Sequence, residues 1–161
     1  MTTCAQPPAY QAIIAAPGFA VGIACNGDEI TAIDYLAPCA EQAPQTPLAH
    51  ETVRQLRAYL ANPAHEFSLP LQARGTHFQR RVWQAIADIP LGQTRSYGEV
   101  AARLGSGPRA VGGACGANPY PLVVPCHRVL AAHGLGGFGR AGGDWLLEIK
   151  RFLLRHEGLA V

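Results

Sequence analysis

The first third of the chain alternates short apolar runs with turn residues, which is the pattern of a small antiparallel sheet. Apolar runs at residues 13–14, 19–25 and 29–36 are separated by Pro17-Gly18 and by Asn26-Gly27-Asp28. Because Asn and Gly both tolerate positive φ angles, the second junction predicts a hairpin with a type I′ turn. Residues 37–47 contain three prolines and are predicted as a loop, and residues 67–71 are predicted as a further strand.

Helical spacing dominates the rest of the chain. Apolar residues three and four apart predict a helix over 48–61. Two capping boxes, Thr76 with Gln79 and Ser96 with Glu99, predict the starts of two more helices. Another helix is expected from Pro108 to about residue 117, and the last from an N-cap at Asp144. The change of pattern near residue 75 predicts two domains, residues 1–74 and 75–161.

The helices predicted on either side of Gly105 form a helix-turn-helix candidate. In the second of them Gly112 and Gly113 each cost about 1 kcal/mol of helix propensity relative to alanine. That cost is explained if another backbone approaches closely, and either DNA or a packed neighbouring helix meets this requirement. Arg109 is the one long charged residue of this helix.

Composition and charge narrow the class of protein. The chain has 161 residues, 48% of them hydrophobic and 15% charged, which excludes a disordered chain. No apolar run reaches the roughly 18 residues of a membrane span, and the first residues lack the features of a signal peptide, so we expect a cytoplasmic protein. Net charge is −3 over residues 1–74 and +5 over residues 75–161, which favours the second half as a nucleic-acid-binding face. The five cysteines include no CxxC motif, which favours free thiols over a disulfide framework.

Cys126 and His127 are the candidate reactive pair. They follow residues 122–124, which are predicted as a short buried strand. Imidazole can accept the proton of a thiol, and the thiolate is the nucleophile. Consecutive side chains of an extended segment point to opposite sides, so we expect the two groups to communicate through a water molecule or a bend in the chain.

Glu157 continues the apolar stripe of the last helix. A buried carboxylate needs a partner, and His127 would be a suitable one because the contact would fix its tautomer. The alternative is a solvated helix end with Glu157 and Lys150 exposed. A zinc site at Cys4, Cys25 and Cys39 is disfavoured, because no further cysteine or histidine has zinc-finger spacing.

Five segments together resemble the O6-alkylguanine-DNA alkyltransferases, also called methylated-DNA-protein-cysteine methyltransferases. They read GTHFQRRVW, IPLGQTRSYGEVA, RAVGGACGANP, VPCHRV and KRFLLRHEG. The resemblance covers residues 75–130 and resumes at residues 150–158. It implies an α/β (α+β) fold, in which a small ribonuclease-H-like domain with an antiparallel sheet precedes a mostly helical domain with the helix-turn-helix. The implied activity is repair of O6-alkylguanine, and of O4-alkylthymine, by base flipping and a single irreversible transfer to cysteine, without a cofactor or metal.

The resemblance also implies roles for individual residues. Cys126 accepts the alkyl group, His127 acts as base through a bridging water, and Glu157 orients His127. Asn118 braces the turn before the active site, and Tyr97 assists rotation of the nucleotide and protonation of the base. The residues expected to contact DNA in the minor groove are Arg109, Ala110, Gly112, Gly113, Ala114, Tyr97 and Arg128. The residues expected to line the substrate pocket are Val129, Pro121, Gly139 and Lys150.

Two departures from the family pattern concern the pocket. The segment between Phe138 and Lys150 is longer than usual, and Gly139 stands where many members have a serine. Together with Pro121, the small Gly139 predicts room for a group as large as benzyl. The rival hypotheses are a DNA-binding sensor of alkylguanine that transfers nothing and a cysteine hydrolase using Cys126, His127 and Glu157. We expect double-stranded DNA as the partner and a monomer in solution.

Overall fold

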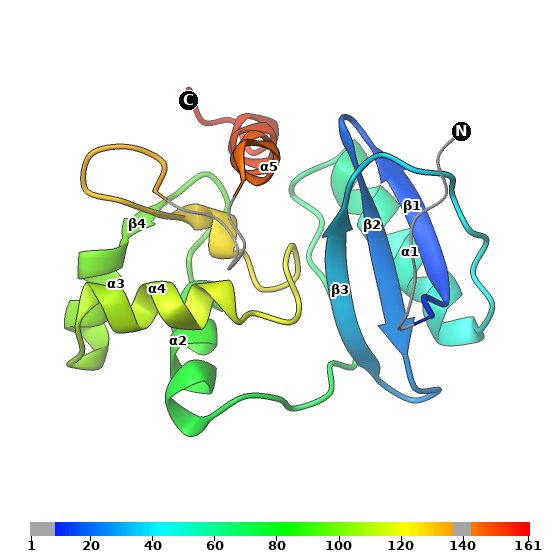
Figure 1. The fold of residues 1–161 in the computed structure, drawn as a ribbon, viewed down its shortest axis with the longest axis horizontal. Helices are drawn as coiled ribbons and strands as arrows, with labels where there is room; N and C mark the ends of the chain where they lie inside the picture. Colours follow the sequence, from blue (N-terminus) through cyan, green and yellow to red (C-terminus); the bar gives the residue numbers. More distant parts are fainter. Residues whose placement is uncertain (1–8, 137–142) are drawn as a thin grey trace. The chain divides into compact units, whose positions relative to one another are not determined.

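The computed structural model describes residues 9–136 and 143–161 (Figure 1). The chain divides into two compact units between Ala73 and Arg74. Within the described residues, no helix is long and apolar enough to cross a membrane.

The first unit is built on a three-stranded antiparallel sheet in the order β1-β2-β3 (Figure 1). The strands are β1 (Ala12–Ala16), β2 (Phe19–Cys25) and β3 (Ile30–Leu36). Gly18 turns the chain between β1 and β2 at φ +86°. The next turn differs from the predicted type I′ turn, because only Gly27 has a positive φ and the Asn26 side chain accepts hydrogen bonds from the N–H groups of Asp28 and Glu29. The sequence signal thus located the hairpin correctly but not its turn type.

Helix α1 (Pro47–Ala61) packs on this sheet through Ala49, Val53, Leu56 and Tyr59. Thr46 caps its first turn by accepting a hydrogen bond from the N–H of Ala49. The apolar spacing had predicted this helix to within one residue at its start.

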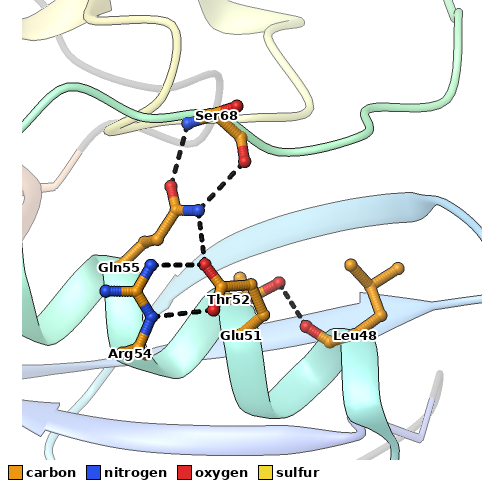
Figure 2. A network of polar contacts seen from close by, with 6 residues as sticks. All are labelled: Leu48, Glu51, Thr52, Arg54, Gln55 and Ser68. Carbon is orange, nitrogen blue, oxygen red and sulfur yellow. Dashed lines mark hydrogen bonds and ion pairs between the residues drawn. The ribbon is translucent and has the colours of Figure 1, made fainter.

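Figure 2 shows how α1 holds the segment that follows it. The buried amide of Gln55 donates to the carbonyl of Ser68 at 2.9 Å and accepts from the N–H of Ser68 at 2.9 Å. This clamp satisfies both backbone groups of Ser68. The strand predicted over residues 67–71 is therefore reduced to a single parallel bridge between Ile30 and Leu71, and Pro70 has no N–H to extend it.

The second unit is mostly helical. Helix α2 (His77–Ala87) and helix α3 (Tyr97–Leu104) both begin with the predicted capping boxes. Helix α4 (Pro108–Gly116) begins at the expected proline, and Gly105 in the left-handed conformation ends α3. Helix α5 (Asp144–His156) has Gly143 as its N-cap, so Asp144 is its first residue and not the cap. A carboxylate in the first turn still interacts favourably with the helix dipole.

The segment before the reactive cysteine is a turn and not the predicted strand. The N–H of Val124 donates to the carbonyl of Tyr120 at 2.8 Å, and the side chain of Asn118 donates to the carbonyl of Val124 at 2.9 Å. Leu122 has a φ of +76°, which is incompatible with a strand. The apolar run was misleading because buried turns and buried strands have the same composition. The predicted fold class, a small antiparallel sheet plus a helical unit with a helix-turn-helix, is confirmed.

Candidate active site and DNA-binding face

A two-stranded parallel pairing places the parts of the site next to each other. Strand β4 (Arg95–Ser96) leads directly into α3, and β5 (Val129–Leu130) directly follows the 3-10 helix η1 (Cys126–Arg128). Arg95 pairs with Val129 and Ser96 with Leu130. The pairing therefore aligns the start of α3, where Tyr97 lies, with the segment that contains Cys126.

Cys126 is buried, with 5% of its surface exposed. Its Sγ accepts a hydrogen bond from Nδ2 of Asn118 at 3.1 Å. The same Asn118 accepts from the N–H of Tyr120 through Oδ1, so its side chain holds both ends of the turn. Asn118 thus occupies the bracing position predicted for it and in addition contacts the sulfur.

His127 and Glu157 are joined, which is what the resemblance implied and one of the two alternatives that the apolar stripe left open. Nε2 of His127 lies 2.8 Å from Oε2 of Glu157, and both side chains are completely buried. Because a carboxylate only accepts hydrogen bonds, this contact assigns the proton to Nε2 and leaves the lone pair on Nδ1. Burial, together with the charges of Arg128 and Lys150, lowers the pKa of His127 against the opposing effect of Glu157, so the ring is neutral at pH 7.

Arg128 binds the carboxylate of Glu157. Its Nε and Nη2 donate to the two oxygens of Glu157 at 2.9 and 3.0 Å, and its Nη1 donates to the carbonyl of Ile89 at 2.7 Å. Only 13% of its side chain is exposed. Arg128 thus supplies the countercharge of Glu157 in this structure, and its DNA contact stays a prediction.

Lys150 is fully buried in α5. Its Nζ donates to the carbonyl of Val129 at 2.7 Å and lies 5.9 Å from the centre of the Tyr97 ring. Burial lowers the pKa of Lys150 to about 8, against the opposing effect of the thiols of Cys115 and Cys126. The exposed helix end considered for Lys150 and Glu157 is therefore excluded, and the charge of Lys150 acts on the thiol of Cys126.

Sequence reasoning missed Cys115, which lies in the last turn of α4. The thiols of Cys115 and Cys126 are hydrogen-bonded to each other. This bond lowers the pKa of Cys115 and raises that of Cys126, which burial raises further. Lys150 favours the charged form of both. The sequence shows a cysteine three residues before Asn118. It does not show that the thiols of Cys115 and Cys126 come together, because this depends on the turn between them.

Tyr97 is half-buried at the start of α3. Burial, assisted by the charges of Cys115 and Cys126, raises the pKa of Tyr97 to about 12. Its hydroxyl therefore remains protonated at neutral pH and can donate a hydrogen bond.

The exposed face of α4 carries few side-chain atoms. Arg109, Ala110 and Gly113 are exposed, and Gly112 is half-exposed. A Cβ added at Gly112 or Gly113 would meet no atom within 4 Å, so neither glycine is there to admit a neighbouring helix. Ala114 differs from the prediction because it is 3% exposed, and its carbonyl accepts the indole N–H of Trp83 at 2.8 Å.

The predicted pocket residues are only partly placed. Val129 is buried directly after η1, and Pro121 is half-exposed in the turn before Cys126. Gly139 lies outside the described residues. The described residues contain no group of three or more His, Cys, Asp or Glu side chains arranged to hold a metal ion.

The expectation of free thiols is wrong at one position. Cys25, Cys115 and Cys126 are free, whereas Cys39 is disulfide-bonded. Pairing depends on which segments the fold brings together, and the spacing of cysteines along the chain does not show it.

Fold and site together define a helix-turn-helix protein in which a buried cysteine is followed in sequence by a buried, neutral histidine. Residues 77–159 match the family described as 6-O-methylguanine DNA methyltransferase, DNA binding domain. The chain belongs to this family, as its sequence motifs indicated.

Relatives and solved structures agree with this assignment. The methylated-DNA-protein-cysteine methyltransferase of Mycolicibacterium paratuberculosis is 52% identical over 108 residues, which cover 65% of this chain and 62% of that protein. The constitutive enzyme of the same name from Bacillus subtilis is 45% identical over 72% of this chain and 70% of its own. The crystal structure of Mycobacterium tuberculosis OGT in complex with DNA is similar with a TM-score of 0.76 and 40% identity, covering 90% of each chain.

Proposed function

We propose that this protein repairs O6-alkylguanine, and O4-alkylthymine, in double-stranded DNA by transferring the alkyl group to Cys126. The observation that carries the proposal is the constellation around Cys126. A buried thiol accepts a hydrogen bond from Asn118 and feels the charge of Lys150, and the next residue, His127, has a buried neutral ring; the same unit presents the exposed, glycine-bearing face of α4. The relatives named for this reaction support it. Residues 1–74 form the preceding α/β domain, and residues 75–161 form the domain that binds DNA.

The chemistry follows from the proton positions. Nδ1 of His127 takes the proton of the Cys126 thiol through a water molecule, and Glu157 and Arg128 stabilise the imidazolium that forms. The thiolate attacks the alkyl carbon, the C–O6 bond breaks, and the hydroxyl of Tyr97 protonates the departing base. The product is a thioether, which has no route back to the thiol, so each molecule acts once.

The carbonyls of Cys126 and Val129 hold the exocyclic amine of guanine. Each of them already accepts one hydrogen bond, from the N–H of Val129 and from Lys150. The second lone pair of each carbonyl oxygen is used for the base.

Access to the buried thiol requires the damaged base to leave the stack, at a cost of a few kcal/mol. The exposed face of α4 lies in the minor groove, where small residues let the helix approach the backbones of DNA. Arg109 fills the space left by the base. Arg109→Ala should therefore slow repair in duplex DNA much more than transfer from free O6-benzylguanine, and equal losses would assign Arg109 a structural role.

Pro121 packs against the alkyl substituent. Its half-exposed ring in the turn before Cys126 supports this placement. Free O6-benzylguanine should inactivate the protein, and Pro121→Ala should slow that reaction. A protein that accepts methyl groups from DNA but remains unmodified by O6-benzylguanine would disprove an open pocket.

The decisive experiment is mass spectrometry of the protein after incubation with DNA containing O6-methylguanine. One methyl group on Cys126 supports transfer. Repeated turnover would support a cysteine hydrolase, and tight binding without an adduct would support a sensor. Cys126→Ser should bind methylated DNA and accept no methyl group, whereas Cys25→Ser, a matched change at another free thiol, should react normally. We propose that the protein acts as a monomer in the cytoplasm.

A further inference from the structure

Two thiols of the second unit lie near each other, and Asn118 contacts both of the residues that carry them. Cys115 is partly exposed in the last turn of α4, and Cys126 is buried at the start of η1. Asn118 donates its backbone N–H to the carbonyl of Cys115 at 3.2 Å and its side-chain amide to Sγ of Cys126 at 3.1 Å. A hydrogen bond joins the thiol of Cys115 to that of Cys126. The two thiols are therefore neighbours although the turn separates them in sequence.

The surroundings of this thiol pair favour one negative charge, which belongs to Cys115 because the interaction lowers its pKa and raises that of Cys126. Lys150 acts on both sulfurs, and the hydrogen bond lets a thiol stabilise the neighbouring thiolate. A thiolate next to a thiol is the arrangement that oxidants convert to a disulfide, because the first sulfur is oxidised and the second one captures it. Both cysteines are free in the structure, so the pair is in its reduced form.

We propose that Cys115 and Cys126 form a reversible disulfide when the protein meets a peroxide, and that this disulfide withdraws the alkyl acceptor from reaction. The thiolate attacks one peroxide oxygen and the O–O bond breaks, giving a sulfenic acid and, after protonation, water. The remaining thiol attacks the sulfenic sulfur, the S–O bond breaks, and a second water leaves as the S–S bond forms. The two sulfurs lose two electrons and one hydrogen peroxide is reduced to two waters. A thiol reductant reverses the step.

Geometry and chemistry both favour this product over deeper oxidation. A disulfide needs the two sulfurs to close to about 2.05 Å, and the amide of Asn118 must release Sγ of Cys126 for this to happen. A sulfenic acid without a neighbouring thiol proceeds to sulfinic acid, which is irreversible in most proteins. Cys115 therefore preserves Cys126 for later use. That the disulfide blocks repair rests on the proposed function, whereas its formation does not.

The chain provides a direct assay. Trypsin cleaves after Arg109 and Arg128, and the peptide of residues 110–128 contains Cys115 and Cys126 and no other cysteine. The intact protein is treated with hydrogen peroxide without DNA, the remaining thiols are blocked with iodoacetamide, and the digest is analysed by mass spectrometry. We expect this peptide to lose the mass of two hydrogens, to carry no blocking group, and to regain both thiols after treatment with dithiothreitol.

Variants separate this proposal from general oxidation. In Cys115→Ser the same peptide should instead gain oxygen atoms at Cys126 that dithiothreitol does not remove, whereas Cys25→Ser should behave as the unchanged protein. Methyl acceptance, measured before and after peroxide within each variant, should fall with the disulfide fraction and return on reduction only where Cys115 is present. Identical over-oxidation of Cys126 with and without Cys115, or pairing of either cysteine with another one, overturns the proposal. A disulfide formed in a protein that never accepts methyl would instead refute the proposed function alone.

Discussion

The two units of the chain differ in what they bury. Among the described residues, the buried polar side chains of the first unit are Thr52 and Gln55, which are both neutral. Those of the second unit are His127, Lys150 and Glu157. Burying a charged group costs several kcal/mol unless pairing offsets it, and a fold of this size does not require it. The contrast places the costly buried groups around the segment of Cys126, because Lys150 acts on its thiol and Glu157 holds the next residue, His127.

The largest effect on the free energy of unfolding is expected from removing the charge of Glu157, which joins His127 and Arg128. Glu157→Gln leaves Arg128 and His127 without a carboxylate and should lower the free energy of unfolding by about 3–5 kcal/mol. Trp83 and Trp145 are the two tryptophans of the chain and both belong to the second unit, so urea unfolding followed by tryptophan fluorescence reports on this unit.

The matched control is Glu148→Gln in α5. Glu148 is exposed and pairs with Arg151 in the same helix. Its loss should change the free energy of unfolding by no more than ~0.5 kcal/mol. Equal effects of the two substitutions would mean that the buried carboxylate contributes no more than an exposed one.

A substitution in the core of the first unit should lower stability without changing the transfer reaction. Leu56 is completely buried in α1, and Leu56→Ala should lower the local stability of the first unit by about 2–5 kcal/mol through lost burial and a cavity. Faster hydrogen exchange of the amides of β2 would show this. Methyl acceptance per folded molecule should not change, because every proposed site residue belongs to the second unit. A slower transfer by the folded variant would contradict this separation.

A smaller effect is expected at the polar clamp of the first unit. Gln55→Ala removes both hydrogen bonds to Ser68 and should cost about 1–3 kcal/mol, because the two backbone groups lose their partner. The N–H of Ser68 should exchange faster as a result. Arg54→Ala, one position earlier on α1 and without contact to Ser68, is the control and should leave that exchange rate unchanged.

The difference between local and tertiary causes explains which features the sequence predicted. Capping boxes act within four residues, so the starts of α2 and α3 were correctly predicted. Glu157 could be inferred because a carboxylate on an apolar stripe needs a partner. The turn before Cys126 depends on Asn118 reaching Val124, the thiol contact of Cys115 depends on that turn, and Arg128 resembles any surface arginine until its partner is known. None of these three was visible in spacing or composition.

The last prediction uses the pH dependence of the buried charge. Lys150 is the single lysine of the chain, and burial lowers its pKa from 10.5 to about 8 in the folded protein. Between these two values the unfolded chain binds a proton that the folded protein has lost, so the stability contributed by this group rises as pH increases from about 8 to 10.5. At pH 7 the group is charged in both states, and the cost of burying that charge is fully present.

Lys150→Met keeps the length of the side chain and removes its titration. The free energy of unfolding of the unchanged protein, measured relative to that of Lys150→Met by tryptophan fluorescence, should therefore increase from pH 7.5 to pH 9.5. The comparison cancels the titration of Tyr97 and His127 to the extent that the substitution leaves their pKa values unchanged. The thiols of Cys115 and Cys126 also face Lys150, so the measurement is repeated in a Cys115→Ser background. A difference that is flat or falls with pH in both backgrounds would show that Lys150 keeps its charge in the folded protein well above pH 8.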